Sequence, residues 1–96
     1  CSLLIASLDL ARRQLVADAG ASIGRSLAAA ARLRDLIAAG GRFDDAGPAM
    51  LASPDVVALD PLHVVIETRS GGISGHDARA MLLRDHAVHV EMATDD

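Results

Sequence analysis

The sequence contains no lysine, and all nine of its basic residues are arginine. A lysine amine forms the Schiff base in carbonyl chemistry and follows the last glycine of a Walker phosphate-binding loop, so these residues can do neither. The single cysteine, Cys1, excludes an internal disulfide and a cysteine-rich zinc site. No run approaches the ~18 consecutive apolar residues of a membrane-spanning helix, so we expect no membrane partner.

Aromatic side chains are almost absent as well, because Phe43 is the single one. Hydrophobic residues make up 51% of the 96, but nineteen of them are alanines, which bury little area each. A chain of this length is one small domain or part of a larger one. We expect a weak core that depends on packing contacts from outside these residues. The net charge of −4, without a basic patch, argues against nucleic-acid binding.

The first 41 residues carry the apolar spacing of a helix. Two stripes recur at intervals of three and four residues: Leu4, Leu8, Ala11 and Leu15, then Ile23, Leu27, Ala30, Leu33 and Ile37. One helix of that length would be about three times the usual length, and Gly20 and Gly24 weaken it. We therefore predict a helical segment over 1–41 that is kinked or broken near Asp18–Ser22 and ends at Gly40–Gly41.

Residues 42–61 hold Gly47, all three prolines and four aspartates, which is the composition of a connector. A short extended piece is expected within it, at Val56–Val57.

The remaining residues, 62–96, show a strand, helix, strand pattern. Leu62–Thr68 is rich in β-branched residues, Ser74–Asp85 has a helical apolar face, and Val88–Met92 alternates strictly. The predicted fold class is α/β, with a long kinked or broken helix followed by the start of a small domain. Two strands and one helix are only marginally stable alone.

The glycine-rich turn between the first strand and the helix has two interpretations, a phosphate cradle or a capped turn. Gly71, Gly72 and Gly75 do not fit the dinucleotide spacing, and no lysine is available for a Walker loop. Ser74 followed three residues later by Asp77 fits a capping box, so we predict a turn and a helix cap. Ser74, His76 and Asp77 lie too close in sequence to form a nucleophilic triad.

Four polar residues on the two predicted strands raise the question of a metal site. His63 and Glu67 share one strand face, and His89 and Glu91 share one face of the other, so neighbouring strands could bring the four together. A partly solvated sheet face is the interpretation we favour, and we assign no metal ligand. Glu91, between apolar neighbours, faces either water or a pocket for a cationic group.

Four segments, in order over nearly the whole chain, resemble the bacterial ornithine/lysine/arginine decarboxylases. The segments are Ser2–Arg13 (similar to LLxASLDxAR), Asp60–Ile66 (DPxKhxI), Ile73–Ala78 (hSGhEA) and Val88–Ala93 (IxVEMA). Two positions depart from the family: His63 stands where lysine is common, and Ala87 stands where a glycine usually closes the helix, so that turn is expected to be strained.

The resemblance implies a pyridoxal-phosphate enzyme of the aspartate-aminotransferase fold. In that family the Schiff-base lysine, the aspartate on the pyridine nitrogen and the histidine on the ring lie upstream, and none is present here. Together with the missing initial methionine, this leads us to expect a fragment: the interdomain helix (1–41), the connector and an incomplete small domain. The parent is expected to be cytoplasmic, a homodimer or higher oligomer, and active in amino-acid and polyamine metabolism.

The functional prediction is a fragment of a decarboxylase of arginine, lysine or ornithine that is inactive alone. It contains no catalytic, cofactor-binding or metal-binding residue, and only Glu91 is assigned to substrate, near its distal amine or guanidinium. The alternative is a free-standing interaction module whose alanine-rich helical face binds another protein. An upstream reading frame with a Ser-x-His-Lys motif would favour the enzyme.

Overall fold

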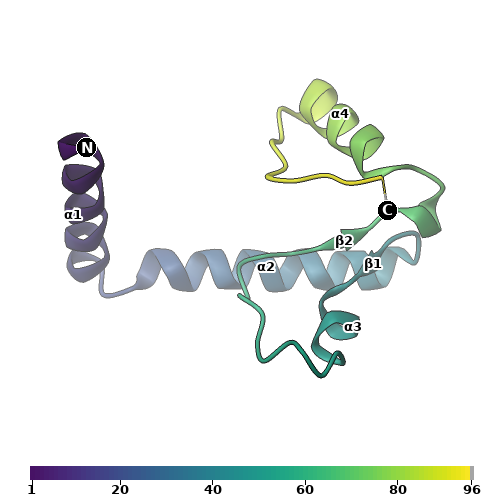
Figure 1. The fold of residues 1–96 in the computed structure, drawn as a ribbon, viewed down its shortest axis with the longest axis horizontal. Helices are drawn as coiled ribbons and strands as arrows, with labels where there is room; N and C mark the ends of the chain where they lie inside the picture. The colour runs from purple at the N-terminus through teal and green to yellow at the C-terminus, as the bar shows by residue number, and fades with distance from the viewer. Residues whose placement is uncertain (96) are drawn as a thin grey trace.

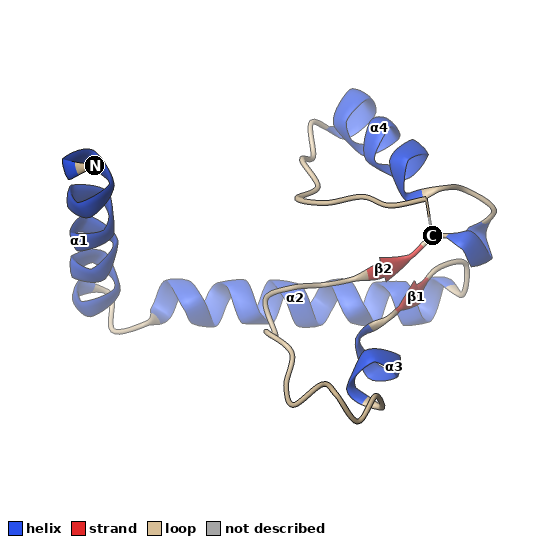
Figure 2. Ribbon diagram, in the orientation of Figure 1, coloured by secondary structure: helices blue, strands red, loops and turns tan. Residues whose placement is uncertain are grey.

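The computed structural model describes residues 1–95 and is mostly helical. Figures 1 and 2 show a bent chain in which two long helices lead into a smaller part built from short elements. In chain order these are α1 (Ser2–Ala17), α2 (Ala21–Gly40), β1 (Asp44–Asp45), α3 (Gly47–Leu51), β2 (Ile66–Glu67), a 3₁₀ turn (Arg69–Gly71) and α4 (Gly75–His86).

The predicted break in the first helical segment is confirmed. The chain leaves α1 at Asp18 and turns through Ala19 and Gly20, whose φ angles are 52° and 79°. A carboxylate oxygen of Asp18 then accepts a hydrogen bond of 2.9 Å from the Ser22 N–H, one of the unpaired donors in the first turn of α2. As a result α1 stands across the end of α2 and away from the rest of the chain (Figure 1).

The far end of α2 also follows the prediction, because Gly41 closes it in the left-handed region at φ 61°. Glycine adopts that conformation without a side-chain penalty. The expected connector contains two elements that were not predicted: β1, and α3 with a proline in its first turn. Val56–Val57 form no strand.

The strand predicted over Leu62–Thr68 is shortened to β2. It pairs antiparallel with β1, with Asp44 opposite Glu67 and Asp45 opposite Ile66. The ladder ends there because β1 has only two residues. Upstream of β2, the carbonyls of Pro61 and His63 accept hydrogen bonds from Arg34 instead.

The second predicted strand, Val88–Met92, is wrong: this segment is irregular. Alternation alone does not make a strand, because the backbone also needs a neighbouring strand to pair with, and the sheet within residues 1–95 consists of β1 and β2 alone. The segment instead runs back past the start of α4, where the backbone of Thr94 lies against Gly75. The strand–helix–strand α/β arrangement is therefore not formed, and a small two-stranded antiparallel sheet takes its place.

The described residues have almost no buried core, as the alanine-rich composition predicts. Ala30 is the one buried residue among them. The accessible surface is 7535 Å², against roughly 5,200 Å² for a compact monomer of this mass. The radius of gyration is 16.4 Å, against about 12.5 Å for a compact chain of this length. No helix within residues 1–95 has the length and apolarity to cross a membrane.

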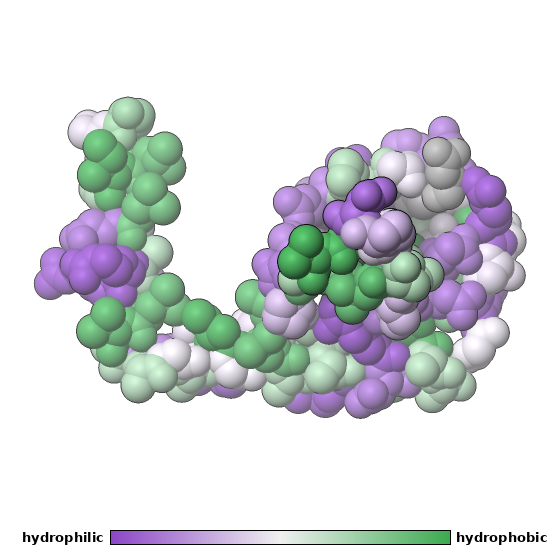
Figure 3. All heavy atoms as spheres, turned by 60° about the horizontal axis from the view of Figure 1, so that its bottom comes forward, coloured by the Kyte–Doolittle hydropathy of each residue, from purple (hydrophilic) through white to green (hydrophobic). Residues whose placement is uncertain are grey.

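The residues that lack packing contacts lie mainly at one end of the molecule. We call residues 1–29 the arm and residues 30–95 the lobe. All but three of the arm's residues are exposed, whereas α2 beyond Ala30 packs beneath β1 and the segment before β2. Figure 3 shows the arm standing apart from the lobe, with hydrophobic surface over much of it and a hydrophilic band across its middle.

Candidate functional site

Glu91, the residue predicted to bind substrate, lies in the irregular segment after α4 and extends into solvent. Its side chain is 85% exposed, and its Oε2 lies 3.4 Å from Nε2 of His63. The other ring nitrogen of His63, Nδ1, lies 3.3 Å from Oδ2 of Asp60. The structure therefore places an imidazole between two carboxylates, an arrangement that orients the ring and leaves Glu91 free to accept further hydrogen bonds from a cation.

The loop that carries Asp60 and His63 is held by its own backbone. Oδ1 of Asp60 accepts a hydrogen bond of 2.9 Å from the N–H of Leu62, and the Asp60 carbonyl accepts one of 3.0 Å from the N–H of His63. An aspartate that bonds to the N–H two residues ahead fixes a tight turn. This turn sets the position of the His63 ring.

Arg34 of α2 fastens this loop to the rest of the lobe, and sequence analysis missed it. Its guanidinium donates to Oδ2 of Asp45 at 3.1 Å, to the carbonyl of Pro61 at 2.9 Å and to that of His63 at 3.0 Å. The side chains of Arg34 and Asp45 are only 31% and 18% exposed. A signal was available, because an arginine four residues after Ala30 occupies a position on the packed face of α2.

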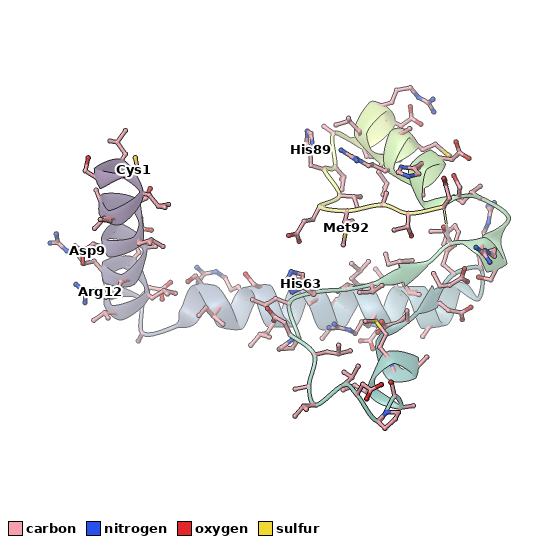
Figure 4. All side chains as sticks on the ribbon, viewed as in Figure 1. Cys1, Asp9, Arg12, His63, His89 and Met92 are labelled. Atoms are coloured by element: carbon pink, nitrogen blue, oxygen red, sulfur yellow. The ribbon has the colours of Figure 1, made fainter. Side chains whose placement is uncertain are left out.

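The four polar residues weighed as a metal site do not come together. His63 meets Glu91, but His89 lies beside the end of α4, well apart from His63 (Figure 4). Glu67 is occupied elsewhere, accepting from the N–H groups of Arg69 and Ser70 at 2.7 and 3.2 Å. Within residues 1–95 no group of three or more His, Cys, Asp or Glu side chains is placed to hold a metal ion.

The glycine-rich turn is a helix cap, as predicted. Oγ of Ser74 accepts a hydrogen bond of 3.1 Å from the Asp77 N–H, and the Ser74 hydroxyl donates to the Asp77 carboxylate at 2.9 Å. The carboxylate thus binds the hydroxyl of the cap rather than the backbone N–H that a full capping box would use. A depression of about 330 Å³ lies beside the turn, and its lining includes one cationic and one anionic side chain, those of Arg69 and Asp95.

Two carboxylates at turns have pKa values below their ordinary range. Hydrogen bonds from the backbone N–H groups of Ser70 and Arg69 hold the pKa of Glu67 below its ordinary value. Hydrogen bonds from Ser22 lower the pKa of Asp18 in the same way. Both carboxylates therefore stabilise local structure through these hydrogen bonds.

Ala87, the residue expected at a strained turn, closes α4 in the left-handed region at φ 54°. A side chain there costs roughly 1–2 kcal/mol relative to a glycine. The prediction of strain at this turn is confirmed in its geometry.

Comparison with known proteins relates the chain to decarboxylases. It is 30% identical over 91 residues to an arginine decarboxylase of Bacillus cereus, covering 95% of this chain and 20% of that protein. Arginine decarboxylases of Halalkalibacterium halodurans and Bacillus subtilis are 32% and 30% identical over 91 residues, covering 18% and 19% of those proteins. No family model matches, and no solved structure gives a significant match. The chain thus spans about a fifth of the length of the curated relatives it matches.

Proposed function

We propose that this chain is a segment of a pyridoxal-phosphate-dependent decarboxylase that acts on a basic amino acid, with arginine as the first candidate. The observation that carries the proposal is the similarity of nearly the whole chain to proteins named arginine decarboxylase. In the proposed parent, residues 1–41 form the connection between two domains, residues 42–61 are a connector, and residues 62–96 open the smaller domain. The parent is proposed to work as a homodimer or higher oligomer.

None of these residues can bind the cofactor covalently through a Schiff base. Pyridoxal phosphate is held in such enzymes by a Schiff base to a lysine, and this chain has no lysine. Its arginines cannot replace that amine because they stay protonated at ordinary pH. The cofactor therefore belongs to the proposal only as a group bound by other parts of the longer protein.

Within this segment, Glu91 is the residue proposed to bind the far end of the substrate. The carboxylate of Glu91 is exposed and lies beside the imidazole of His63, which also contacts Asp60. A guanidinium donates two parallel hydrogen bonds to a carboxylate, which a single ammonium cannot do. Arginine is therefore the substrate that this carboxylate would recognise best.

The test uses the product of the complete reading frame that contains this segment. We expect it to release CO2 from L-arginine faster than from L-lysine or L-ornithine when pyridoxal phosphate is supplied. The 96-residue chain alone is expected to release none and to form no borohydride-reducible adduct with the cofactor. A full-length protein that releases CO2 from none of the three amino acids would overturn the proposal.

A second experiment separates the role of Glu91 from the proposed reaction. Glu91→Gln in the full-length protein should raise the Michaelis constant for the amino acid by roughly ten-fold or more, because a charged hydrogen-bond partner is lost. Glu67→Gln is the matched control, since the N–H groups of Arg69 and Ser70 already occupy its carboxylate. Equal kinetic constants for the two variants would leave the reaction standing and remove Glu91 from the substrate site.

One observation favours the alternative, an interaction module without catalysis. The arm exposes large apolar side chains that a monomer of these residues leaves uncovered. Exposed apolar surface of this extent marks a site of protein contact. A reading frame confined to this segment would favour the module, whereas one that continues into a Ser-x-His-Lys motif would favour the enzyme.

A further inference from the structure

The imidazole of His63 faces two carboxylates that come from different segments of the chain. Its Nδ1 lies 3.3 Å from Oδ2 of Asp60, and its Nε2 lies 3.4 Å from Oε2 of Glu91. A neutral imidazole has one N–H group and one lone pair, whereas an imidazolium has two N–H groups. Only the protonated ring therefore presents an N–H group to both carboxylates at once.

Asp60 is the better partner for the neutral ring. It lies in the same turn as His63, where its Oδ1 accepts a hydrogen bond of 2.9 Å from the N–H of Leu62. Glu91 lies in the irregular segment after α4, and its side chain is 85% exposed. A contact with Glu91 must order that distant segment, which costs conformational entropy. We therefore expect the neutral ring to donate to Asp60 and to turn its lone pair toward Glu91.

The other charged groups around the loop of His63 are paired with each other. Arg34 of α2 donates to the carbonyl of His63 at 3.0 Å, and its guanidinium also donates to Oδ2 of Asp45 in β1 at 3.1 Å. His89, in the irregular segment after α4, lies well apart from His63 (Figure 4). Within residues 1–95 the two carboxylates are therefore the charged groups in contact with the ring.

Protonation of His63 changes what Glu91 can bind. A guanidinium binds a carboxylate best through both of its oxygens in parallel. An imidazolium beside Oε2 of Glu91 occupies one of these oxygens and compensates the negative charge, so it competes with a cationic ligand. The neutral ring leaves both oxygens and the full charge available. Imidazoles ordinarily change their charge between about pH 5 and 8, so this competition depends on pH near neutrality.

We propose that His63 is a positioning residue whose protonation controls whether Glu91 is available to the cationic end of the substrate. This rests on the proposed role of Glu91 in substrate binding and adds a means of regulation to that site. Both contacts of the ring are exposed to solvent, so the effect is modest. The protonated ring should weaken the binding of L-arginine roughly two- to five-fold.

The first test measures the Michaelis constant for L-arginine between about pH 5.5 and about pH 8, with the product of the complete reading frame. Dividing the wild-type constant by that of His63→Gln cancels the titration of other groups. The quotient should rise roughly two- to five-fold toward the acid end, because only the wild-type ring gains a proton. The corresponding quotient of turnover numbers should stay constant. A quotient of Michaelis constants that does not change with pH overturns the proposal.

Two further variants sharpen this test. His63→Lys carries a fixed positive charge beside Glu91, so its Michaelis constant should be raised over that of His63→Gln across the whole pH range. His89→Gln is the matched control, and dividing the wild-type constant by its own should give the same value at every pH. A constant for His63→Lys as low as that of His63→Gln, or an equal pH effect of His89→Gln, overturns the proposal.

The second test does not use the reaction, so it separates a failure of this proposal from a failure of the proposed decarboxylase. Melting temperatures of the full-length wild type, His63→Gln, Glu91→Gln and the double variant form a double-mutant cycle. The cycle should give a coupling of roughly 1 °C at the acid end of the range and none at the basic end. That coupling in a protein that releases no CO2 would overturn the decarboxylase and leave the control of Glu91 by His63 standing. Equal coupling at both ends, or none at either, overturns the proposal even in an active enzyme.

Discussion

The arm is richer in apolar residues than the lobe, with 17 of 29 against 32 of 66, and the two regions are stabilised in different ways. Polar contacts in the arm join neighbouring residues, such as the ion pair of Asp9 with Arg12. In the lobe, arginines join segments that are far apart in sequence: Arg34 reaches two carbonyls before β2, and Arg42 reaches the Gly71 carbonyl at 3.3 Å. The difference shows that the shape of the lobe depends on directional hydrogen bonds, because neither part has an apolar core.

The largest effect is expected from removing the central contact of the lobe. Arg34→Ala deletes three hydrogen bonds and leaves Asp45 half-buried without its partner, so the free energy of unfolding should fall by about 2–3 kcal/mol. Urea denaturation followed by circular dichroism measures it. Arg32→Ala, an exposed change on the same helix, should stay within about 0.5 kcal/mol. Equal losses for the two variants would contradict the role given to Arg34.

Two glycine-to-alanine substitutions, one in each region, should change stability in opposite directions. In the lobe, a methyl group on Gly71 would meet the Phe43 ring, so Gly71→Ala should destabilise by about 1–3 kcal/mol. In the arm, Gly24 lies inside α2 with open space around it, so Gly24→Ala should raise helix stability by about 0.5–1 kcal/mol. Thermal melting of both variants checks the pair, and a stabilising Gly71→Ala would show that the ring is not packed there.

The cap of α4 should contribute less to stability than the contacts of Arg34. Ser74→Ala removes the acceptor for the Asp77 N–H and should cost about 1 kcal/mol. His76→Ala loses only an exposed contact with Asp95 at 3.9 Å and should cost less than about 0.5 kcal/mol. Urea midpoints of the two variants in the same buffer provide the measurement, and a larger loss for His76→Ala would mean that the turn is held in another way.

A smaller effect is expected on the pH dependence of the lobe. Because hydrogen bonds lower the pKa of Glu67 in the folded chain, its contribution is present above its ordinary pKa of 4.5 and is lost as the pH falls through the lower folded value. Glu67→Gln should therefore flatten the acid side of a plot of melting temperature against pH. An unchanged slope in that variant would assign the acid sensitivity to other carboxylates.

Local signals predicted much of the fold, but long-range contacts did not follow from sequence. The break near Asp18, the end at Gly41 and the Ser74 cap depend on residues within one turn of each other, so the sequence specifies them directly. The alternation of Val88–Met92 is equally clear, but a strand needs a neighbour that the local sequence does not supply. β1 was missed for the opposite reason, because two aspartates have little tendency to form a strand until β2 pairs with them.

The same distinction between local signals and long-range contacts applies to the candidate site. Glu91 was selected from alternation and from resemblance to a family, and its role in substrate binding stays a prediction. Its contact with His63, and the anchoring of that loop by Arg34, come from segments separated by about 30 residues in the chain. Sequence patterns that span three or four residues do not identify contacts between residues so far apart, so only the folded structure reveals these contacts.

Hydrogen–deuterium exchange of the isolated 96-residue chain tests the contrast between the two regions most directly. Amides of α1 should exchange rapidly, because no other element among residues 1–95 covers that helix. Amides of β2 and α4 should be better protected, because their contacts lie within the lobe. Protection of α1 equal to that of α4 would contradict the account.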